Sequence, residues 1–439
     1  MIRKELNIMF PVKIKLWDSV SLSVINTNKF KTAMIFFSFR LPRDRAIAAP
    51  KLALPGILRR GTKEYPSAAR LNLELDKLYA ATVEIKLSHL GKNDLLTFAA
   101  DMLDNTFIPD GTDVLDGVIK LISEMVLHPI TENGVFPKET VEKEKANVLD
   151  ALKAEANNPR TYAASRCAEL LHEADPDFAT LSALISEISE ADERSVFDVY
   201  QKLLSSAALD IFYVGAEEPA RVEASLRKHF SDFAPKALPA SVPAAEKFSR
   251  LKDVKEPFPV SQSKLSLGFR LGVCPADKDY YAAILFNEIL GGSPASKLFM
   301  NVRERLSLCY YCSSHYDPYF GNLTVSSGVD NENAETAKAE ILAQIEDMKN
   351  GRISDVEFNA AKRAFEHYCR QIYDYPFDIF AFYRSRAVLG VVTTIEQHAK
   401  RISEVTLDDV IAVAQKITLD TVYLLEGTLD SDEEVGEDE

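Results

Sequence analysis

Positive charge, long apolar runs and cysteine are all scarce in this sequence, and each shortage narrows the kinds of protein that the chain can be. The 66 acidic residues outnumber the 51 basic ones, and a net charge of −15 argues against binding to nucleic acid or to an anionic membrane. Apolar runs such as 33–39 are far shorter than the ~20 residues that a membrane-spanning helix needs. Five cysteines in 439 residues favour reduced thiols and a cytoplasmic location, and the first residues predict no signal peptide.

Motifs of nucleotide and nucleophile chemistry are missing as well. No glycine-rich loop follows a predicted strand, and no serine or cysteine lies in a recognised nucleophile motif. Cys309 and Cys312 have the spacing of a redox or zinc pair, but no second pair accompanies them. Their segment is typical of a strand, in which residues three apart point to opposite faces, so we interpret both as buried structural cysteines.

The chain contains an internal repeat. Phe39-Arg40-Leu41 recurs 230 residues later as Phe269-Arg270-Leu271, and the later segment 209–213 recurs as 419–423. Matches in the same order, with spacing that falls from 230 to 210 residues, indicate a tandem duplication of a domain of roughly 200 residues. Each half is long enough to bury its own core.

The order of predicted elements is similar in the two halves. Short apolar strands come first, then paired strands, then long amphipathic helices such as the one beginning at Val114, then a helix–strand pair. This order predicts an α+β fold, in which each half is an antiparallel-type sheet packed with helices. The predicted parts are an N-terminal domain, a Pro/Ala-rich linker, a C-terminal domain and an acidic disordered tail, at residues 1–230, 231–247, 248–429 and 430–439.

Three segments resemble motifs of the pitrilysin/insulinase-like zinc metallopeptidases. Residues 289–311 are similar to the LGGG-x-SSRLF-x-x-LRE-x-x-x-x-Y pattern in the second half of those proteins. Residues 59–62 are similar to the FKGT that follows the family's zinc helix, and residues 141–145 to its VERER helix. The resemblance covers essentially the whole chain and is, more narrowly, to the non-catalytic member of bacterial heterodimeric pairs. It implies two homologous domains that face each other around a chamber.

The metal-binding positions of the family hold no ligands in this chain. The family binds zinc through HxxEH on one helix, where two histidines are ligands and the glutamate is the general base, and through a distant glutamate. The corresponding positions are Leu52, Pro55, Gly56 and Ala151. The resemblance therefore implies no metal and no cofactor here, with zinc expected in a partner subunit. Pro55 and Gly56 also disfavour a regular helix.

Arg303 and Tyr310 match the Arg/Tyr pair of the family's second half. The resemblance implies that they act in catalysis in trans, beside the zinc of a partner. A tyrosine hydroxyl can donate to the oxyanion of a tetrahedral intermediate, and an arginine can bind a substrate carbonyl. The alternative is that Arg303 is a surface helix residue and Tyr310 a core strand residue.

Two further groups of substrate-binding candidates follow from the resemblance. Thr82, Val83 and Glu84 occupy the place of an edge strand that pairs with the substrate backbone, unless neighbouring structure covers that edge. Gly291 and Gly292 form a turn with unusual backbone angles, which either lets the next helix pack closely or contacts substrate directly.

The functional prediction is a catalytically silent pitrilysin-like subunit that pairs with a homologous, HxxEH-bearing chain to hydrolyse or process peptides. The alternative is a non-catalytic peptide-binding or structural protein of the same fold. We expect a cytoplasmic protein with no nucleic-acid or membrane partner. The peptide substrate, the cleavage preference and any self-association stay open.

Overall fold

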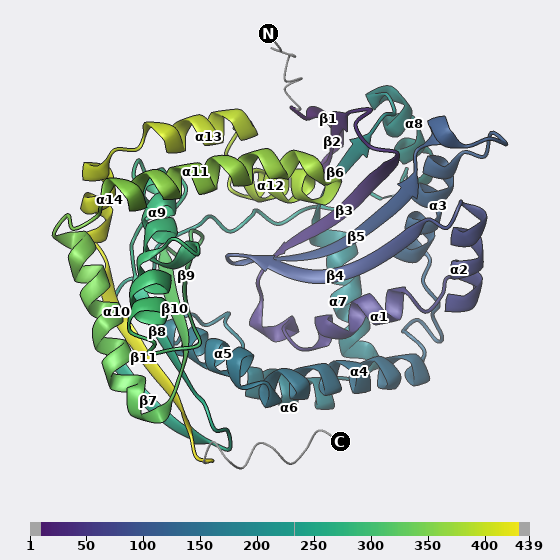
Figure 1. The fold of residues 1–439 in the computed structure, drawn as a ribbon. Coiled ribbons are helices and arrows are strands. Elements are labelled where there is room, and N and C mark those ends of the chain that lie inside the picture. The colour runs from purple at the N-terminus through teal and green to yellow at the C-terminus, as the bar shows by residue number, and fades with distance from the viewer. Residues whose placement is uncertain (1–9, 232, 430–439) are drawn as a thin grey trace, which may run out of the picture. The chain divides into compact units, whose positions relative to one another are not determined.

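The computed structural model describes residues 10–231 and 233–429, so the predicted acidic tail at 430–439 lies outside the described residues. The fold is α+β, as predicted, with two sheets that are each packed with helices (Figure 1). Two compact units can be distinguished, and each combines several stretches of chain. Unit 1 combines Met1–Leu152, Ser182–Ser241 and Ile372–Thr394, and unit 2 combines Lys153–Leu181, Val242–Gln371 and Ile395–Glu439.

The sheet of unit 1 has six strands in the order β1-β2-β6-β3-β5-β4. All neighbours are antiparallel except β2 and β6, which are parallel. Strand β4 lies at one end of this order and pairs only with β5. The strands are β1 (Val12–Trp17), β2 (Val20–Asn26), β3 (Thr32–Pro42), β4 (Thr82–Leu90), β5 (Asn93–Leu103) and β6 (Ala208–Gly215).

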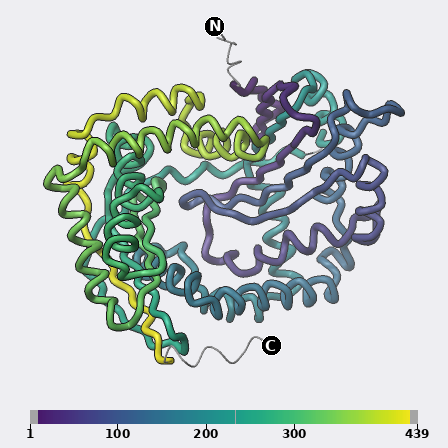
Figure 2. The backbone as a smooth tube through the Cα atoms, viewed as in Figure 1, coloured from purple at the N-terminus to yellow at the C-terminus, as the bar shows by residue number. Residues whose placement is uncertain are grey.

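The sheet of unit 2 has five strands in the order β7-β11-β8-β10-β9. The last strand of the chain, β11, lies inside the sheet, parallel to β7 and antiparallel to β8 (yellow in Figure 2). Strand β9 is the edge strand, paired only with β10. The strands are β7 (Lys252–Phe258), β8 (Ser263–Arg270), β9 (Tyr311–Asp317), β10 (Asn322–Val329) and β11 (Thr418–Gly427).

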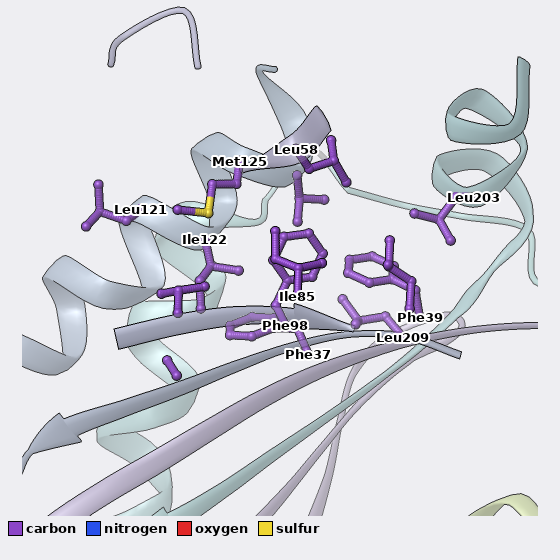
Figure 3. Close-up of a cluster of buried hydrophobic side chains, with 14 of the residues drawn as sticks. Phe37, Phe39, Leu58, Ile85, Phe98, Leu121, Ile122, Met125, Leu203 and Leu209 are labelled. Carbon is purple, nitrogen blue, oxygen red and sulfur yellow. The ribbon is translucent and has the colours of Figure 1, made fainter. Parts of the chain in front are cut away.

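One face of the unit 1 sheet forms a large apolar core with its helices. Helix α3 (Val114–Leu127) buries an apolar stripe at the predicted helical spacing. Phe37, Phe39 and Phe98 lie in this core on β3 and β5 and are fully buried (Figure 3). The other helices of this unit are α1 (Leu54–Leu58), α2 (Ala68–Lys77), α7 (Glu193–Ser206), α8 (Pro219–His229), most of α4 (Lys138–Asn157) and most of α6 (Leu181–Glu190).

The other face of this sheet is covered by α12 (Pro376–Val388), which comes from late in the chain. Phe380 of α12 stacks on Phe36 of β3, with ring centroids 3.7 Å apart, and packs edge-on against Phe212 of β6. Phe36, Phe212 and Phe380 are all buried. The stacked rings therefore hold α12 on the sheet.

Unit 2 receives a helix from early in the chain in the same way. Helix α5 (Pro159–Leu171) packs on β8 and β11, where Cys167 and Leu171 form a small core with Tyr423. A Cβ at Gly268 would lie 2.7 Å from the Leu171 side chain, so glycine permits the close approach. The remaining helices of unit 2 are α9 (Tyr280–Asn287), η4 (Glu288–Gly292), η5 (Leu298–Arg305), α10 (Ala334–Lys349), α11 (Asp355–Gln371), α13 (Ile395–Glu404) and α14 (Leu407–Ala414).

Candidate functional site

The segment at the family's zinc-motif positions is part of the unit 1 core. Leu52 lies in a 3-10 turn, η2 (Pro50–Ala53), and Pro55 and Gly56 lie in α1, a helix of only five residues. Pro55 is tolerated because it occupies the first turn, where its missing N–H needs no partner. Leu58 at the end of α1 points toward Ile85 of β4 and Phe98 of β5 (Figure 3). The short helix therefore serves packing.

The space beside position 56 is filled by a carboxylate from α4. An ideal Cβ built on Gly56 would collide with the carboxylate of Glu144, whose side chain is only 7% exposed. Glu144 forms an ion pair with Arg60 and accepts a hydrogen bond of 3.0 Å from Nδ2 of Asn147. An arginine–glutamate pair thus lies against the position where the family carries a zinc-binding histidine.

The fourth family position, Ala151, lies on the exposed surface of α4, seven residues after Glu144. A methyl group there offers no ligand to a metal. In the parts of the chain that the structure describes, no three His, Cys, Asp or Glu side chains come together as a metal site.

The strand that holds Thr82, Val83 and Glu84 is the edge strand β4 of unit 1. Val83 is buried, whereas the side chains of Thr82 and Glu84 point outward and are exposed. The inner side of β4 pairs with β5, and within residues 10–231 and 233–429 no strand pairs with its outer side. Its outer backbone groups are therefore placed as a β-addition site requires.

Arg303 and Tyr310 both belong to unit 2, on the segment that leads into β9. Arg303 is near the end of η5, and its guanidinium lies over the Phe299 ring, 4.7 Å from the ring centroid. Its side chain is 40% exposed and lies 3.7 Å from Glu304. The alternative prediction that Tyr310 is a core strand residue is wrong, because Tyr310 precedes β9 and is 61% exposed.

Tyr310 is held by two hydrogen bonds, one from its side chain and one from its backbone. Its hydroxyl donates a 3.3 Å hydrogen bond to Oδ1 of Asp330, and its backbone N–H donates to the Gly328 carbonyl at 2.9 Å. Two exposed apolar residues, Met300 and Leu306, lie on the same segment of chain. The segment thus offers an exposed phenol and a half-exposed guanidinium beside apolar side chains.

Gly291 and Gly292 lie in η4, a π-helical turn that packs on β9. A Cβ on Gly291 would lie 2.5 Å from the backbone nitrogen of Ser314, and Gly291 is buried. Gly292 is exposed, and a Cβ there would lie 2.7 Å from the Glu288 carboxylate. Close packing therefore accounts for Gly291, and only Gly292 is open to a ligand.

Comparison with known proteins agrees with these positions. Residues 192–365 match the family model described as "Peptidase M16 inactive domain". The "Probable inactive metalloprotease YmfF" of Bacillus subtilis is 29% identical over 405 residues, which cover 92% of this chain and 95% of that protein. The chain is similar to proteins of the M16 peptidase family. The predicted resemblance to pitrilysin- and insulinase-like proteins is therefore confirmed.

Solved structures share the fold of this chain over nearly its whole length. A conserved protein from Enterococcus faecalis V583 has a TM-score of 0.89 at 25% identity and covers 96% of this chain and 100% of its own. A protease from Helicobacter pylori has a TM-score of 0.81 at 15% identity, covering 95% of this chain and 99% of its own. The second likeness concerns the fold alone.

Sequence reasoning missed a carboxyl group beside the glycine turn of η4. Burial raises the pKa of Glu288, and a hydrogen bond with Ser293 opposes that shift. The only feature of the sequence that could have drawn attention to Glu288 is its place directly before the Ile-Leu-Gly-Gly motif. Glu288 is thus a half-buried acid next to the exposed Gly292.

The two cysteines of the CxxC spacing are buried, as predicted. Only Cys312 lies in β9, whereas Cys309 lies in the irregular segment two residues before that strand begins.

In the two described stretches of the chain, every helix is too short or too polar to cross a membrane.

Proposed function

We propose that this chain is a catalytically silent subunit that binds peptide and contributes Arg303 and Tyr310 to the zinc site of a homologous partner. The partner would carry HxxEH, the zinc ion and the general base. One contrast supports the proposal: ion-paired Glu144 lies against Gly56 in the erased metal site, while Tyr310 presents a solvent-exposed phenol. The similarity to proteins named as inactive supports the same view.

The expected roles of the two residues follow from their chemistry. A Tyr310 hydroxyl that leaves Asp330 can donate to the oxyanion that forms when water attacks a peptide carbonyl. The Arg303 guanidinium can bind a neighbouring carbonyl of the same peptide. Independently of these two residues, the outer edge of β4 in unit 1 would accept an extended peptide as an added strand.

The domain division and the cellular setting are part of the proposal. We propose homologous domains at 1–230 and 248–429, and equivalent ion pairs support the duplication. Arg40 lies 3.5 Å from Asp210 in unit 1, and Arg270 lies 2.9 Å from Asp420 in unit 2. A cytoplasmic location with no nucleic-acid or membrane partner agrees with the net charge of −15.

A second function is favoured by one observation. The Tyr310 hydroxyl is already bound to Asp330, so the residue also fits a purely structural role. In that case the chain is a non-catalytic peptide-binding or structural protein. The two proposals differ in whether Arg303 and Tyr310 affect cleavage in a complex.

Affinity purification from the native host tests the partnership. We expect an HxxEH-bearing homologue to co-purify in equal amount and the complex to cleave unfolded peptides. In that complex, Arg303→Ala and Tyr310→Phe should lower kcat/KM by roughly 10–1,000-fold. Arg305→Ala and Tyr375→Phe serve as matched controls, because both are exposed residues outside the proposed site. Unchanged cleavage in the two test variants would favour the second function.

A further inference from the structure

A largely buried carboxylate reaches into unit 2 from an irregular segment of the chain. Residues 244–251, which we call the strap, form no helix or strand, and Glu246 is the one residue among them that is not exposed. The Glu246 side chain is only 20% exposed. The backbone N–H groups of Ala244 and Glu246 donate to the carbonyls of Tyr319 and Phe320, each at 3.2 Å. The strap is therefore attached to unit 2 around Glu246.

Two side chains of unit 2 hold the Glu246 carboxylate, and a third lies beside them. Arg270 of β8 donates from Nη1 to Oε2 at 2.6 Å, and Nδ1 of His172, at the end of α5, lies 3.1 Å from Oε1. The same Nη1 donates to Oδ1 of Asn322 of β10 at 3.1 Å. Nδ2 of Asn322 is buried and has no hydrogen-bond partner in the part of the chain that the structure describes. The three residues are each at most 9% exposed, so they form a buried set of donors.

The surroundings of His172 favour an anion at this place. Phe178 stacks on the imidazole with ring centroids 5.0 Å apart, and Phe320 is tilted against it at 4.4 Å, so the ring has one orientation. The Nδ1–H of an imidazole in this orientation can donate to a carboxylate. Burial raises the pKa of Glu246, but His172 and Arg270 outweigh burial and lower the pKa to about 2. The group held here is therefore a carboxylate anion near neutral pH.

The sequence repeat shows that the arginine does not need this second carboxylate. Nε of Arg270 donates to the fully buried Asp420 at 2.9 Å. The matching arginine of unit 1, Arg40, lies 3.5 Å from Asp210, and no second carboxylate pairs with it within residues 10–231 and 233–429. One carboxylate is thus enough for the buried arginine of this fold. Glu246 is an additional ligand that comes from outside the sheet.

We propose that Arg270, His172 and Asn322 form a carboxylate-binding site that the chain's own Glu246 occupies, and that a carboxylate of another molecule can displace Glu246 and release the strap. The unpaired Nδ2 of Asn322 is a further donor for the incoming group. The strap buries few side chains, so little apolar contact opposes its release. This inference goes beyond the proposed function and does not depend on it.

The strength of competition follows from the covalent link. A tethered group such as Glu246 acts at an effective concentration in the millimolar range or above. An external carboxylate must therefore be present at a comparable concentration, or make contacts of its own, to replace it. Removal of the Glu246 carboxylate abolishes this competition, so a variant without it should bind a small carboxylate directly.

The first experiment measures thermal unfolding of the full-length Glu246→Ala chain with sodium acetate. Acetate should raise Tm with increasing concentration, by roughly 3–6 °C at ten times its Kd for this variant. Sodium chloride and neutral acetamide at equal concentrations control for ionic strength and for solvent effects. Glu246→Gln, which keeps a side chain in the site, and Glu404→Ala, at an exposed position, are the matched control variants. An acetate effect no larger than that of chloride, or an equal effect in Glu246→Gln, would overturn the site.

The second experiment uses the wild-type chain, so it needs no variant that could fail to fold. Amide hydrogen exchange at Ala244 and Glu246 reports release of the strap, because both N–H groups bond to the backbone of unit 2. Acetate at ~0.1–0.5 M should speed this exchange roughly twofold to tenfold relative to chloride, whereas exchange at Leu267 inside β8 should not change. Unchanged exchange at the strap would overturn the displacement.

The source of the displacing carboxylate is a separate question, because small acids and peptide chain ends carry the same group. Acetyl-dialanine, with its amide as the control, distinguishes the two sources in the same exchange measurement. A stronger effect of acetyl-dialanine than of acetate would assign the site to peptide chain ends, and equal effects would assign it to small free acids. An effect of the amide as large as that of the acid would overturn carboxylate recognition.

Discussion

The carboxylate of Glu144 lies in the space that a side chain at Gly56 would need. Glu144 is almost fully buried and pairs with Arg60, which follows Gly56 by four residues. A glycine at 56 and a glutamate at 144 are therefore matched to each other. The effect of a substitution at one position on stability should therefore depend on which residue occupies the other.

We predict that Gly56→Ala destabilises unit 1. Alanine is the better helix former by ~1 kcal/mol, but its Cβ must displace Glu144 from Arg60 and Asn147, so we expect a net loss of about 1–3 kcal/mol. Urea unfolding measures this free energy. In a Glu144→Ala background the same substitution should be neutral or stabilising, which provides the control. Equal effects in both backgrounds would contradict the packing relationship.

We predict that removal of divalent metal leaves thermal stability unchanged. The four family positions hold Leu52, Pro55, Gly56 and Ala151, and a ligand that does not bind the native state cannot raise Tm. Thermal unfolding with a chelator, and then with added zinc, measures this. A rise in Tm on addition of stoichiometric zinc would show a metal site that these four positions do not reveal.

We predict that Phe380→Ala costs about 3–5 kcal/mol, because the ring is buried between β3 and β6 and stacks on Phe36. Phe377→Ala on the same helix is the matched control. Phe377 is about half exposed, so its loss should cost much less. Denaturant unfolding of both variants compares them, and equal costs would mean that α12 is not held through the Phe36 stack.

Much of this arrangement could be predicted from the sequence, since it depends on local pattern. The stripe of α3, the strands β3 and β8 and the loss of the zinc ligands all follow from periodicity or motif. The docking of α5 and α12 could not, because the partners Tyr423 and Phe36 are each more than 200 residues away. Nothing in the spacing of apolar residues within a helix says which sheet it will cover.

The strand that was predicted to hold Cys309 was misplaced for a local reason. Strand β9 begins two residues after Cys309, and strand ends are the least certain part of a pattern. The exposure of Tyr310 has the same origin, because it also precedes β9.

We predict that acid weakens unit 2 through Glu246. Burial raises the pKa of this carboxyl, but hydrogen bonds and charge from His172 and Arg270 outweigh it and lower the pKa to about 2. A lowered folded-state pKa stabilises the fold above the unfolded pKa of about 4.5, and this stability is lost as the pH falls from there toward 2. Glu246→Gln should flatten that acid limb in urea unfolding measured against pH, while Glu404→Gln, at an exposed site, should not.

The final prediction concerns peptide binding at the outer edge of β4. If an extended peptide adds to this edge, its backbone N–H groups must pair with the strand, so N-methylation at alternate residues should weaken binding by roughly tenfold or more in one register and little in the other. Calorimetric titration of the two methylated peptides and their parent measures this. Glu84→Gln, whose exposed side chain does not form the ladder, should preserve the difference between registers. Equal affinities for both methylated peptides would mean that recognition depends on side chains and not on strand addition.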